Sequence, residues 1–468
     1  MIKKKRNIFS KILIILGSTL LFLITMLGST LLAAAISKGS SNTDPKQTKP
    51  TDSGLVFARY RSLYDKDGKI LRLRGVNLGG LLNTEGWMAP YSCGTESSGS
   101  NWWYPTLSED EARQGLKDNP HLNDTQRETI MSTFRENWVS DNDYRIMKEV
   151  YNFNAIRLPI YWEDLMVKNG DEFSLRDETT AFSYLDHIME QCQLNGLYCI
   201  LDLHAAPITQ SGYEHSGHTT WNKQDLLWYN ENGIKATCDL WEYIANHYTY
   251  TKPELGQVIA TYDLLNEPST SRTKELWEED LRYTTEDCYP VFDRIYKTIR
   301  NTGDQHVITM NFVWTYWQLP NPYMYGWKNI QYELHFYNDL RDRFTWDTMM
   351  YGFEFTRFFH DYELPIYIGE FNAYGNMDDW IYLFDYFERR GYSWTFWTYK
   401  IAVTGNWTSN WGLYNYKLGL SGNQKKVNLK TDNYTKIMQM CEESNTSNCD
   451  TSTCAETIRQ YMQKYKEA

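Results

Sequence analysis

The stretch VIATYDLLNEP at residues 258–268 is an apolar run that ends in an amide, a carboxylate and a proline, Asn266, Glu267 and Pro268. A continuous apolar run without alternation is typical of a parallel β-strand that is buried on both faces of a sheet. A second stretch, PIYIGEF at 365–371, follows the same pattern and carries Glu370 near its end. Both stretches therefore predict buried parallel strands whose carboxyl ends carry acidic side chains.

Six further segments have the composition of strands and alternate with helical patterns. They are LRLRGVNLGG (71–80), NAIRLPI (154–160), YCILDLH (198–204), HVITMNFVW (306–314), IQYELHFY (330–337) and YSWTFWTY (392–399). Eight strand–helix units predict an α/β fold of the (β/α)8 type, a TIM barrel, in a single domain. A doubly wound open sheet is the alternative, but no glycine-rich phosphate loop follows any of the strands.

The helical patterns fall between the strands, as a barrel requires. They cover 140–153, 181–196, 238–248, 291–303, 346–361 and 378–391. The segment after the fifth strand is short and contains two prolines, so we expect only a turn of helix there. Two further helical patterns, at 433–444 and 454–466, contain cysteines and predict a final helical layer.

In a barrel of this kind, functional side chains gather at the carboxyl ends of the strands. Taken singly, these residues also have structural interpretations: Glu267 could pair with Arg157 inside the barrel, and the histidines could belong to the core. Their shared position at one rim favours a functional site. The candidate residues are Arg157, His204, Asn266, Glu267, His335, Tyr337, Glu370 and Trp397.

The N-terminal segment differs from the rest of the chain. Residues 1–11 are basic, and residues 12–37 carry no charge. About 25 helical residues span roughly 37 Å, which is enough to cross a bilayer core of about 30 Å. We favour an uncleaved transmembrane signal anchor over a cleaved signal peptide, although Ala33–Ala35 would suit cleavage.

This segment sets the expected organisation of the chain. The basic region 1–11 stays cytoplasmic, residues 38–54 form a flexible linker, and the domain at 55–468, including the C-terminal cysteine-containing helices, lies outside the cell. The protein is then either membrane-anchored on the extracellular face (type II) or secreted.

Composition limits the classes of partner and cofactor that we expect for this chain. The net charge of −12 gives no basic footprint, so we expect no nucleic-acid partner. The eight cysteines fit an exported protein with disulfide bonds, whose pairing cannot be read from the sequence. No CxxC pair or histidine-rich tract suggests a metal site. Glycosylation sequons occur at Asn123, Asn406, Asn433 and Asn445.

Seven blocks of sequence carry a resemblance to a known family. RGVNLGG (74–80), NAIRLPIYWED (154–164), LDLHAAP (201–207), YDLLNEP (262–268), ELHFY (333–337), IGEF (368–371) and FWTY (396–399) resemble, in order, glycoside hydrolase family 5 of the (β/α)8 retaining glycosidases. RGVNLGG and LHAAP are similar to its exo-β-1,3-glucanase branch. LLNTEGWM (81–88) departs from that branch, which has a tryptophan and an acidic residue soon after the two glycines.

The resemblance implies roles for the two acidic residues. Glu267 would be the general acid and then the general base, with a pKa raised by the Glu370 carboxylate. Glu370 would be the nucleophile, and retention requires the two carboxyl groups to lie about 5–5.5 Å apart.

The resemblance also implies roles for the residues around this pair. Arg157 and Tyr337 would hold Glu370 charged and oriented, and Asn266 would contact the sugar 2-hydroxyl. The remaining three would position the sugar or the acid, or form the floor under the ring: His204, His335 and Trp397. This mechanism implies no metal or organic cofactor.

We therefore expect a retaining glycoside hydrolase that cleaves β-glucosidic bonds in β-glucans, similar to a glucan 1,3-β-glucosidase. The alternatives are an endo-β-1,4-glucanase, a glycolipid glycosidase and, more remotely, a non-catalytic carbohydrate-binding surface protein. An insertion at about 81–142 with Trp87, Trp102, Trp103 and Tyr104 is either a packed lid or a wall that makes cleavage exo-acting. The expected partners are a β-glucan and, through an uncleaved N-terminus, a membrane, with the protein itself a monomer.

Overall fold

A computed structural model gives the fold of the chain. The structure describes residues 54–94, 107–270, 287–312, 319–338, 340–359, 361–403, 408–418 and 425–466. The predicted basic region, anchor and most of the linker lie outside these ranges, as do Trp102, Trp103 and Tyr104. Within the described ranges, none of the helices combines the length and the apolar character needed to span a bilayer.

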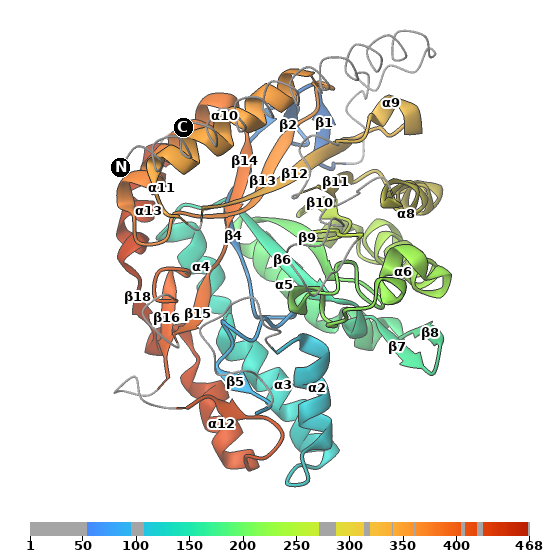
Figure 1. Ribbon diagram of the computed structural model, residues 1–468, viewed down its shortest axis with the longest axis vertical. Helices are drawn as coiled ribbons and strands as arrows, with labels where there is room; N and C mark the ends of the chain where they lie inside the picture. The colour runs from blue at the N-terminus through green and yellow to red at the C-terminus, as the bar shows by residue number, and fades with distance from the viewer. Residues whose placement is uncertain are drawn as a thin grey trace, which may run out of the picture.

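Eight parallel strands close into a barrel, and all eight were predicted from the sequence. Each strand pairs with the next in chain order, and the last pairs with the first, so the open-sheet alternative is wrong. Figure 1 shows the strands at the centre of the molecule. They are β4 (Arg74–Asn77), β6 (Ala155–Tyr161), β9 (Tyr198–Ala205), β10 (Ile259–Asp263), β11 (Val307–Asn311), β12 (Ile330–Tyr337), β13 (Ile366–Asn372) and β14 (Ser393–Phe396).

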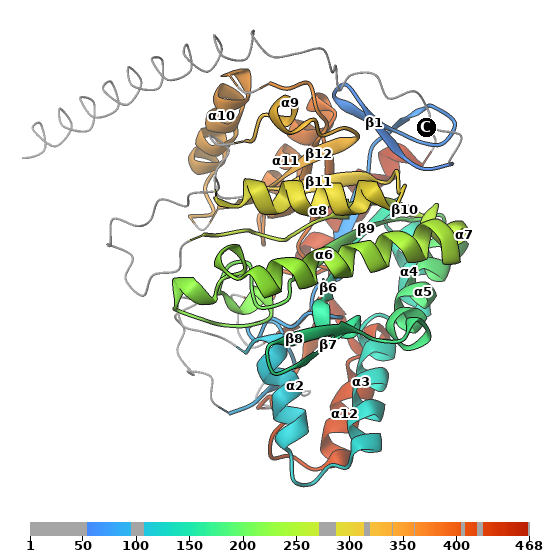
Figure 2. The same ribbon diagram turned by 90° about the vertical axis from the view of Figure 1, so that its right-hand side faces the viewer.

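The barrel helices surround these strands, as Figures 1 and 2 show. Their order follows the prediction, and the segment after β11 forms only the short helix α9. The helices are α4 (Asp141–Glu149), α5 (Glu178–Asn195), α6 (Glu231–Asn246), α7 (Pro253–Gly256), α8 (Tyr289–Asn301), α9 (Pro322–Tyr325), α10 (Arg343–Phe359), α11 (Met377–Arg390) and α13 (Thr453–Met462).

Capping residues explain where these helices begin and end. The Asp177 carboxylate accepts a hydrogen bond from the Thr180 amide at the start of α5, and Gly196 ends that helix with φ of 61°. Helix α6 begins seven residues before the predicted start, because the Asn230 side chain accepts a hydrogen bond from the Gly233 amide.

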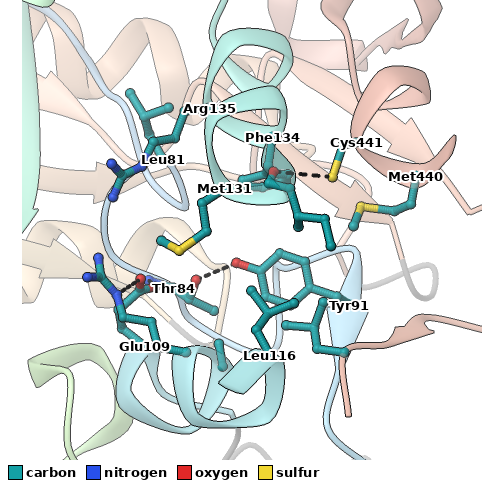
Figure 3. Close-up of a pocket in the computed structure, with 14 residues that line it drawn as sticks. Leu81, Thr84, Tyr91, Glu109, Leu116, Met131, Phe134, Arg135, Met440 and Cys441 are labelled. Atoms are coloured by element: carbon teal, nitrogen blue, oxygen red, sulfur yellow. Dashed lines mark hydrogen bonds and ion pairs between the residues drawn. The ribbon is translucent and has the colours of Figure 1, made fainter. Parts of the chain in front are cut away.

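The insertion between β4 and α4 is largely a packed helical layer. It contains α2 (Glu109–Asp118) and α3 (Asp124–Trp138), neither of which was predicted, and they lie with α12 (Tyr434–Glu443) at the lower end of Figures 1 and 2. Figure 3 shows the small cavity that these helices enclose, where the Tyr91 and Thr84 hydroxyls share a hydrogen bond.

Several small sheets and turns complete the fold. The short strands are β1 (Phe57–Arg59), β2 (Ser62–Tyr64), β3 (Ile70–Leu71), β5 (Tyr91–Ser92), β7 (Met166–Asn169), β8 (Glu172–Leu175), β15 (Lys400–Val403), β16 (Tyr414–Lys417), β17 (Val427–Asn428) and β18 (Asp450–Thr451). Short 3₁₀ turns occur at 162–164, 214–216, 223–225, 227–229, 446–448 and 463–465, and a π turn at 247–251.

The expected disulfides are absent. All eight cysteines lie in the described part of the chain, and none of them forms a disulfide. Most are small core residues, and burial raises the pKa of the Cys441 thiol to about 12. Asn123 and Asn433 cap helices α3 and α12 with their side chains, and Asn406 lies outside the described ranges, so glycosylation stays a prediction.

Trp380 of α11 connects the outer ring to the barrel. Its ring lies 5.7 Å from Phe371 and 5.2 Å from Phe396, and its indole N–H donates to the Tyr374 carbonyl. Replacing it with alanine leaves a large cavity, so we expect Trp380→Ala to lower the free energy of unfolding by about 3–5 kcal/mol. Urea unfolding of this variant measures the loss, and Ile381→Ala, on the exposed side of the same helix, is the control. A loss no larger than that of the control would contradict this packing.

Candidate active site

The structure brings all eight candidate residues together at the carboxyl ends of the barrel strands. Their side chains form one connected set: Asn266 links Arg157 to His204, and Glu370 links Arg157 to Tyr337. The Glu267 carboxylate joins through His335, and the Trp397 ring stacks on His204 with centroids 5.4 Å apart. The predicted grouping of these polar residues at one rim is therefore confirmed, and their roles stay a prediction.

Glu267 and Glu370 face each other across a narrow gap. One oxygen of each carboxylate and a ring nitrogen of His335 all lie within 4.8 Å of one another. The same His335 Nδ1 lies 2.8 Å from Glu267 Oε1 and 3.6 Å from Glu370 Oε2. Both glutamates are largely buried. This close approach of the nearest carboxylate oxygens is compatible with the carboxyl separation of about 5–5.5 Å in a retaining pair.

Arg157 of β6 forms an ion pair with the Glu370 carboxylate. Its Nη1 donates to Glu370 Oε1 at 2.9 Å, and the Tyr337 hydroxyl donates to Glu370 Oε2 at 2.7 Å. Both oxygens of the carboxylate are therefore held in place by hydrogen-bond donors. The Nη2 of Arg157 donates to Asn266 Oδ1 at 2.8 Å, which leaves the Asn266 amide nitrogen directed towards His204.

Glu267 does not have the raised pKa that was expected for it. Burial alone would raise its pKa, but the hydrogen bond with His335 and the charges of the neighbouring histidines lower it to about 2. Burial lowers the pKa of His335, but the Glu370 charge and the bonds to Glu267 and Glu333 outweigh it and raise the pKa to about 10. The proton of this pair therefore rests on His335 in the free site.

The backbone at Glu267 is unusual. Its φ is 41°, in the left-handed region that non-glycine residues rarely adopt. The preceding residue is fixed on both sides, because the Asn266 amide donates to the Leu203 carbonyl and the Gln210 side chain donates to the Asn266 carbonyl. Such strain, held in place by its surroundings, is typical of functional positions.

Three buried carboxylates below the rim were missed in the sequence. Asp202, Asp263 and Glu333 lie around Arg157, at 3.2, 2.8 and 3.3 Å. Burial and the negative charge of Glu333 raise the pKa of Asp263 well above its usual range, although the Arg157 charge opposes this rise. Two of them could have been found, because Asp202 and Glu333 each stand two residues before a site histidine and so share its face of the strand.

Two loop residues also enter the site. Glu85 is half-buried and accepts a hydrogen bond from the Trp87 indole at 2.6 Å. Burial, reinforced by the charges of Glu370 and Glu214, raises the pKa of Glu85 well above its usual range despite that bond. The departure of LLNTEGWM from the branch pattern stays a prediction, and the segment itself contains both an acid and a tryptophan that bond to each other.

His215 is the second loop residue, and no pattern in the sequence singled it out. Its Nε2 lies 3.5 Å from Glu267 Oε2, and its carbonyl accepts a hydrogen bond from Asn83. Burial lowers the pKa of His215, although the charges of Glu267 and Glu214 oppose this shift. Its position depends on the path of the loop after β9, which no local pattern encodes.

Gly79 explains why glycine follows the first barrel strand. A Cβ at this position would lie 2.7 Å from the Thr398 hydroxyl and 2.8 Å from the Trp397 ring. Any larger residue would displace Trp397, whose ring is buried and stacks on His204. The first of the two glycines in RGVNLGG, Gly79, therefore leaves room for the Trp397 ring, whereas Gly80 faces Trp138 and Met88.

The spacing of Glu267, His335 and Glu370 would also suit a metal ion. Their atoms already have hydrogen-bonding partners, however, and the Arg157 guanidinium lies 2.9 Å from Glu370, where its charge opposes a cation. The arrangement therefore fits acid–base and nucleophilic chemistry better than metal ligation.

Comparisons with known proteins agree with this geometry. The sequence profile of the cellulase family, glycosyl hydrolase family 5, matches residues 122–403, which is more than half of the chain. A glucan 1,3-beta-glucosidase from Candida oleophila is 30% identical over 202 residues, covering 42% of this chain and 42% of that protein. A beta-xylosidase from Phanerodontia chrysosporium is 28% identical over 255 residues, covering 53% of this chain and 44% of that protein. The chain thus matches less than half the length of these relatives.

A solved structure shows the same fold. A beta-glucanase from Saccharophagus degradans superposes with a TM-score of 0.51 at 14% sequence identity, covering 92% of this chain and 97% of that one. At this identity the similarity establishes the fold alone.

The pKa shifts of the Glu267–His335 pair predict how stability depends on pH. The pKa of His335 rises from 6.5 to about 10 on folding, so its stabilisation is complete below pH 6.5 and is lost as pH rises through 10. The pKa of Glu267 falls from 4.5 to about 2, so its stabilisation is present above pH 4.5 and is lost towards pH 2.

Urea unfolding between pH 6.5 and pH 10 measures the contribution of His335 to the free energy of unfolding. We expect the wild type to lose more stability than His335→Ala over this range, so that the two curves converge at high pH. The exposed His121 gives a matched control, and His121→Ala should run parallel to the wild type. Parallel curves for the wild type and His335→Ala would show that the pair is not charged.

Proposed function

The chain belongs to glycosyl hydrolase family 5, and from this membership we propose that it is a retaining O-glycosyl hydrolase that cleaves β-glucosidic bonds in β-glucans. The observation that carries the proposal is the facing pair Glu267 and Glu370, with their nearest atoms and His335 within 4.8 Å. A binding protein without activity would not need two such carboxylates, each held by its own donors.

In the first step, a Glu370 oxygen attacks the anomeric carbon, and Glu267 gives a proton to the departing glycosidic oxygen. The proton comes from the Glu267–His335 pair, over the 2.8 Å between His335 Nδ1 and Glu267 Oε1. The Glu370 charge is the main group that raises the pKa of His335. When Glu370 forms its bond to the sugar, this charge disappears, and the proton passes more readily from His335 to Glu267.

In the second step, a water molecule adds to the anomeric carbon and releases Glu370. Glu267 takes a proton from this water and passes it on to His335, so that one water is consumed and both carboxylates and His335 return to their first state. Arg157 and Tyr337 receive the returning charge on Glu370 through the hydrogen bonds they already make. Two displacements at one carbon leave its configuration unchanged.

The remaining site residues bind the sugar. Because Arg157 occupies Asn266 Oδ1, the Asn266 amide nitrogen is the atom left to donate to the sugar 2-hydroxyl. Trp397 forms the apolar floor beneath the ring, and His204 supports it by stacking. Glu85 lies in the insertion after β4 and has a raised pKa. Its carboxyl group can form a hydrogen bond with a hydroxyl of the same sugar.

The finer proposal is a glucan 1,3-β-glucosidase that removes sugars from a chain end. It is supported by the names of the relatives and by the segment 83–87, which comes from the insertion after β4 and lies against the site. A carboxyl group and a tryptophan at that place would close one end of the cleft and leave room for the terminal sugar alone.

A substrate panel tests this proposal. The full chain is assayed with β-1,3-, β-1,4- and β-1,6-linked glucan oligomers and with a glycolipid, and the product sizes are followed over time. We expect glucose as the first product, fastest from β-1,3-linked oligomers. Early release of longer oligomers from β-1,4-linked chains would favour an endo-β-1,4-glucanase, and binding without turnover of any substrate would overturn the enzymatic proposal.

The two carboxylates can be distinguished by removing each in turn. We expect Glu267→Ala and Glu370→Ala each to lower kcat/KM by about 10³-fold or more, whereas Glu254→Gln on the exposed helix α7 should change little. With an activated aryl β-glucoside, added azide occupies the vacated space. It should give the β-glycosyl azide with Glu267→Ala and the α-glycosyl azide with Glu370→Ala, and the reverse products would exchange the two roles.

A further inference from the structure

Helix α10 is apolar on both of its faces. Its inner face packs against the barrel through Trp346, Met350 and Phe353, each 1% exposed, and the Phe353 ring lies 5.6 Å from Phe336 of β12. Its outer face carries a stripe of large apolar side chains at helical spacing, with Phe344 80%, Tyr351 77% and Phe358 79% exposed. Asp347 and Thr348 are also exposed on this helix, so its outer face is an apolar stripe that contains polar residues, and an exposed stripe of this size is typical of a contact surface.

The exposed apolar residues of the molecule are concentrated around this helix. Of the large hydrophobic side chains exposed in the described ranges, eight lie on α9, α10, α11 or the loop before α10, and six are scattered over the remainder. Single exposed apolar residues need no explanation, but a cluster of this size marks an interaction surface. The eight, called the α10 patch below, are Tyr323, Met324, Leu340, Phe344, Tyr351, Phe355, Phe358 and Ile381.

The α10 patch lies at the place where the chain enters the domain. Arg61, just after β1, pairs with Asp361 at the end of α10 at 2.5 Å. Tyr60, Tyr323 and Tyr362 line one shallow pocket between β1, α9 and the end of α10. Figures 1 and 2 both place β1, α9 and α10 at the same end of the long axis of the molecule.

The sequence that precedes β1 is a second observation about the surroundings of the α10 patch. Residues 12–37 carry no charge and follow a basic segment, and only the linker 38–54 separates them from β1. A flexible chain of this length has a mean end-to-end distance of about 20–25 Å. An anchor in a bilayer would therefore hold this end of the domain, and the α10 patch with it, close to the lipid surface.

We propose that the α10 patch rests on a lipid bilayer and inserts its aromatic side chains into the boundary between headgroups and acyl chains. From Phe344 to Phe358 the stripe is about 21 Å long, which suits a helix that lies in the plane of the interface. The charged neighbours are already paired, with Arg343 2.5 Å from Asp379 and Asp347 bonded to the Tyr382 hydroxyl. The contact is therefore apolar and needs no anionic lipid.

The contact would also orient the site. Helix α10 is part of the outer ring and runs antiparallel to β12, so a membrane along α10 is roughly parallel to the barrel axis. The mouth with Glu267 and Glu370 then opens sideways along the membrane surface rather than against it. Glycans at the cell surface could enter the cleft while the domain stays on the bilayer.

Nitroxide labels on the full chain in phosphatidylcholine vesicles test the proposal. Tyr351→Cys and Phe358→Cys place labels on the α10 patch, and Leu194→Cys, 78% exposed on α5 across the barrel, is the matched control. The background is Cys449→Ser, because the other seven native cysteines are buried. Circular dichroism and thermal unfolding confirm that the labelled proteins fold.

The ratio of oxygen to nickel-chelate accessibility reports immersion in lipid. We expect this ratio to be severalfold higher at positions 351 and 358 than at position 194. Equal ratios at the three positions, or failure of the full chain to enter vesicles, would overturn the proposal. A loss of accessibility to both reagents at 351 and 358 would also overturn it, because a protein surface, such as a second copy or residues 12–37, would then cover the patch.

Discussion

The Arg157 guanidinium is the contact on which the rest of the site depends. It is fully buried in the barrel and lies within 3.3 Å of carboxylates from four different strands, Asp202, Asp263, Glu333 and Glu370. Buried charges are tolerated only when they are paired and hydrogen-bonded. Glu370 is thus the member of this network that lies nearest to the rim. The same network fixes the positions of the four strands that contribute its carboxylates.

One arginine cannot neutralise four carboxylates, and the remaining charge explains the protonation of the site. Burial and the charge of Glu333 raise the pKa of Asp263 well above its usual range, which disfavours a further negative charge at this position. A proton on His335 balances another, because the ring lies between Glu267, Glu333 and Glu370. The acid–base function of Glu267 therefore belongs to a pair, and the charge state of Glu370 governs where the pair keeps its proton.

The sequence predicted the barrel and the eight residues of its rim, because buried parallel strands are continuous apolar runs and a polar residue that interrupts them is conspicuous. It did not reveal α2 and α3, whose faces pack against α12 some 300 residues away. Glu85 and His215 were also missed, because loops bring them to the site and no local sequence pattern encodes the path of these loops. The pKa of Glu267 was predicted in the wrong direction because the dominant neighbour is His335, and only the structure shows that contact.

The central claim is that Glu267 and Glu370 are close enough for a covalent glycosyl intermediate on Glu370. The anomeric configuration of the sugar at the moment of release tests this most directly, and proton NMR can follow it while a β-glucan oligomer is hydrolysed. The account predicts that the β anomer appears first and then equilibrates with the α anomer by mutarotation. Initial release of the α anomer would mean a single displacement by water and would contradict the account.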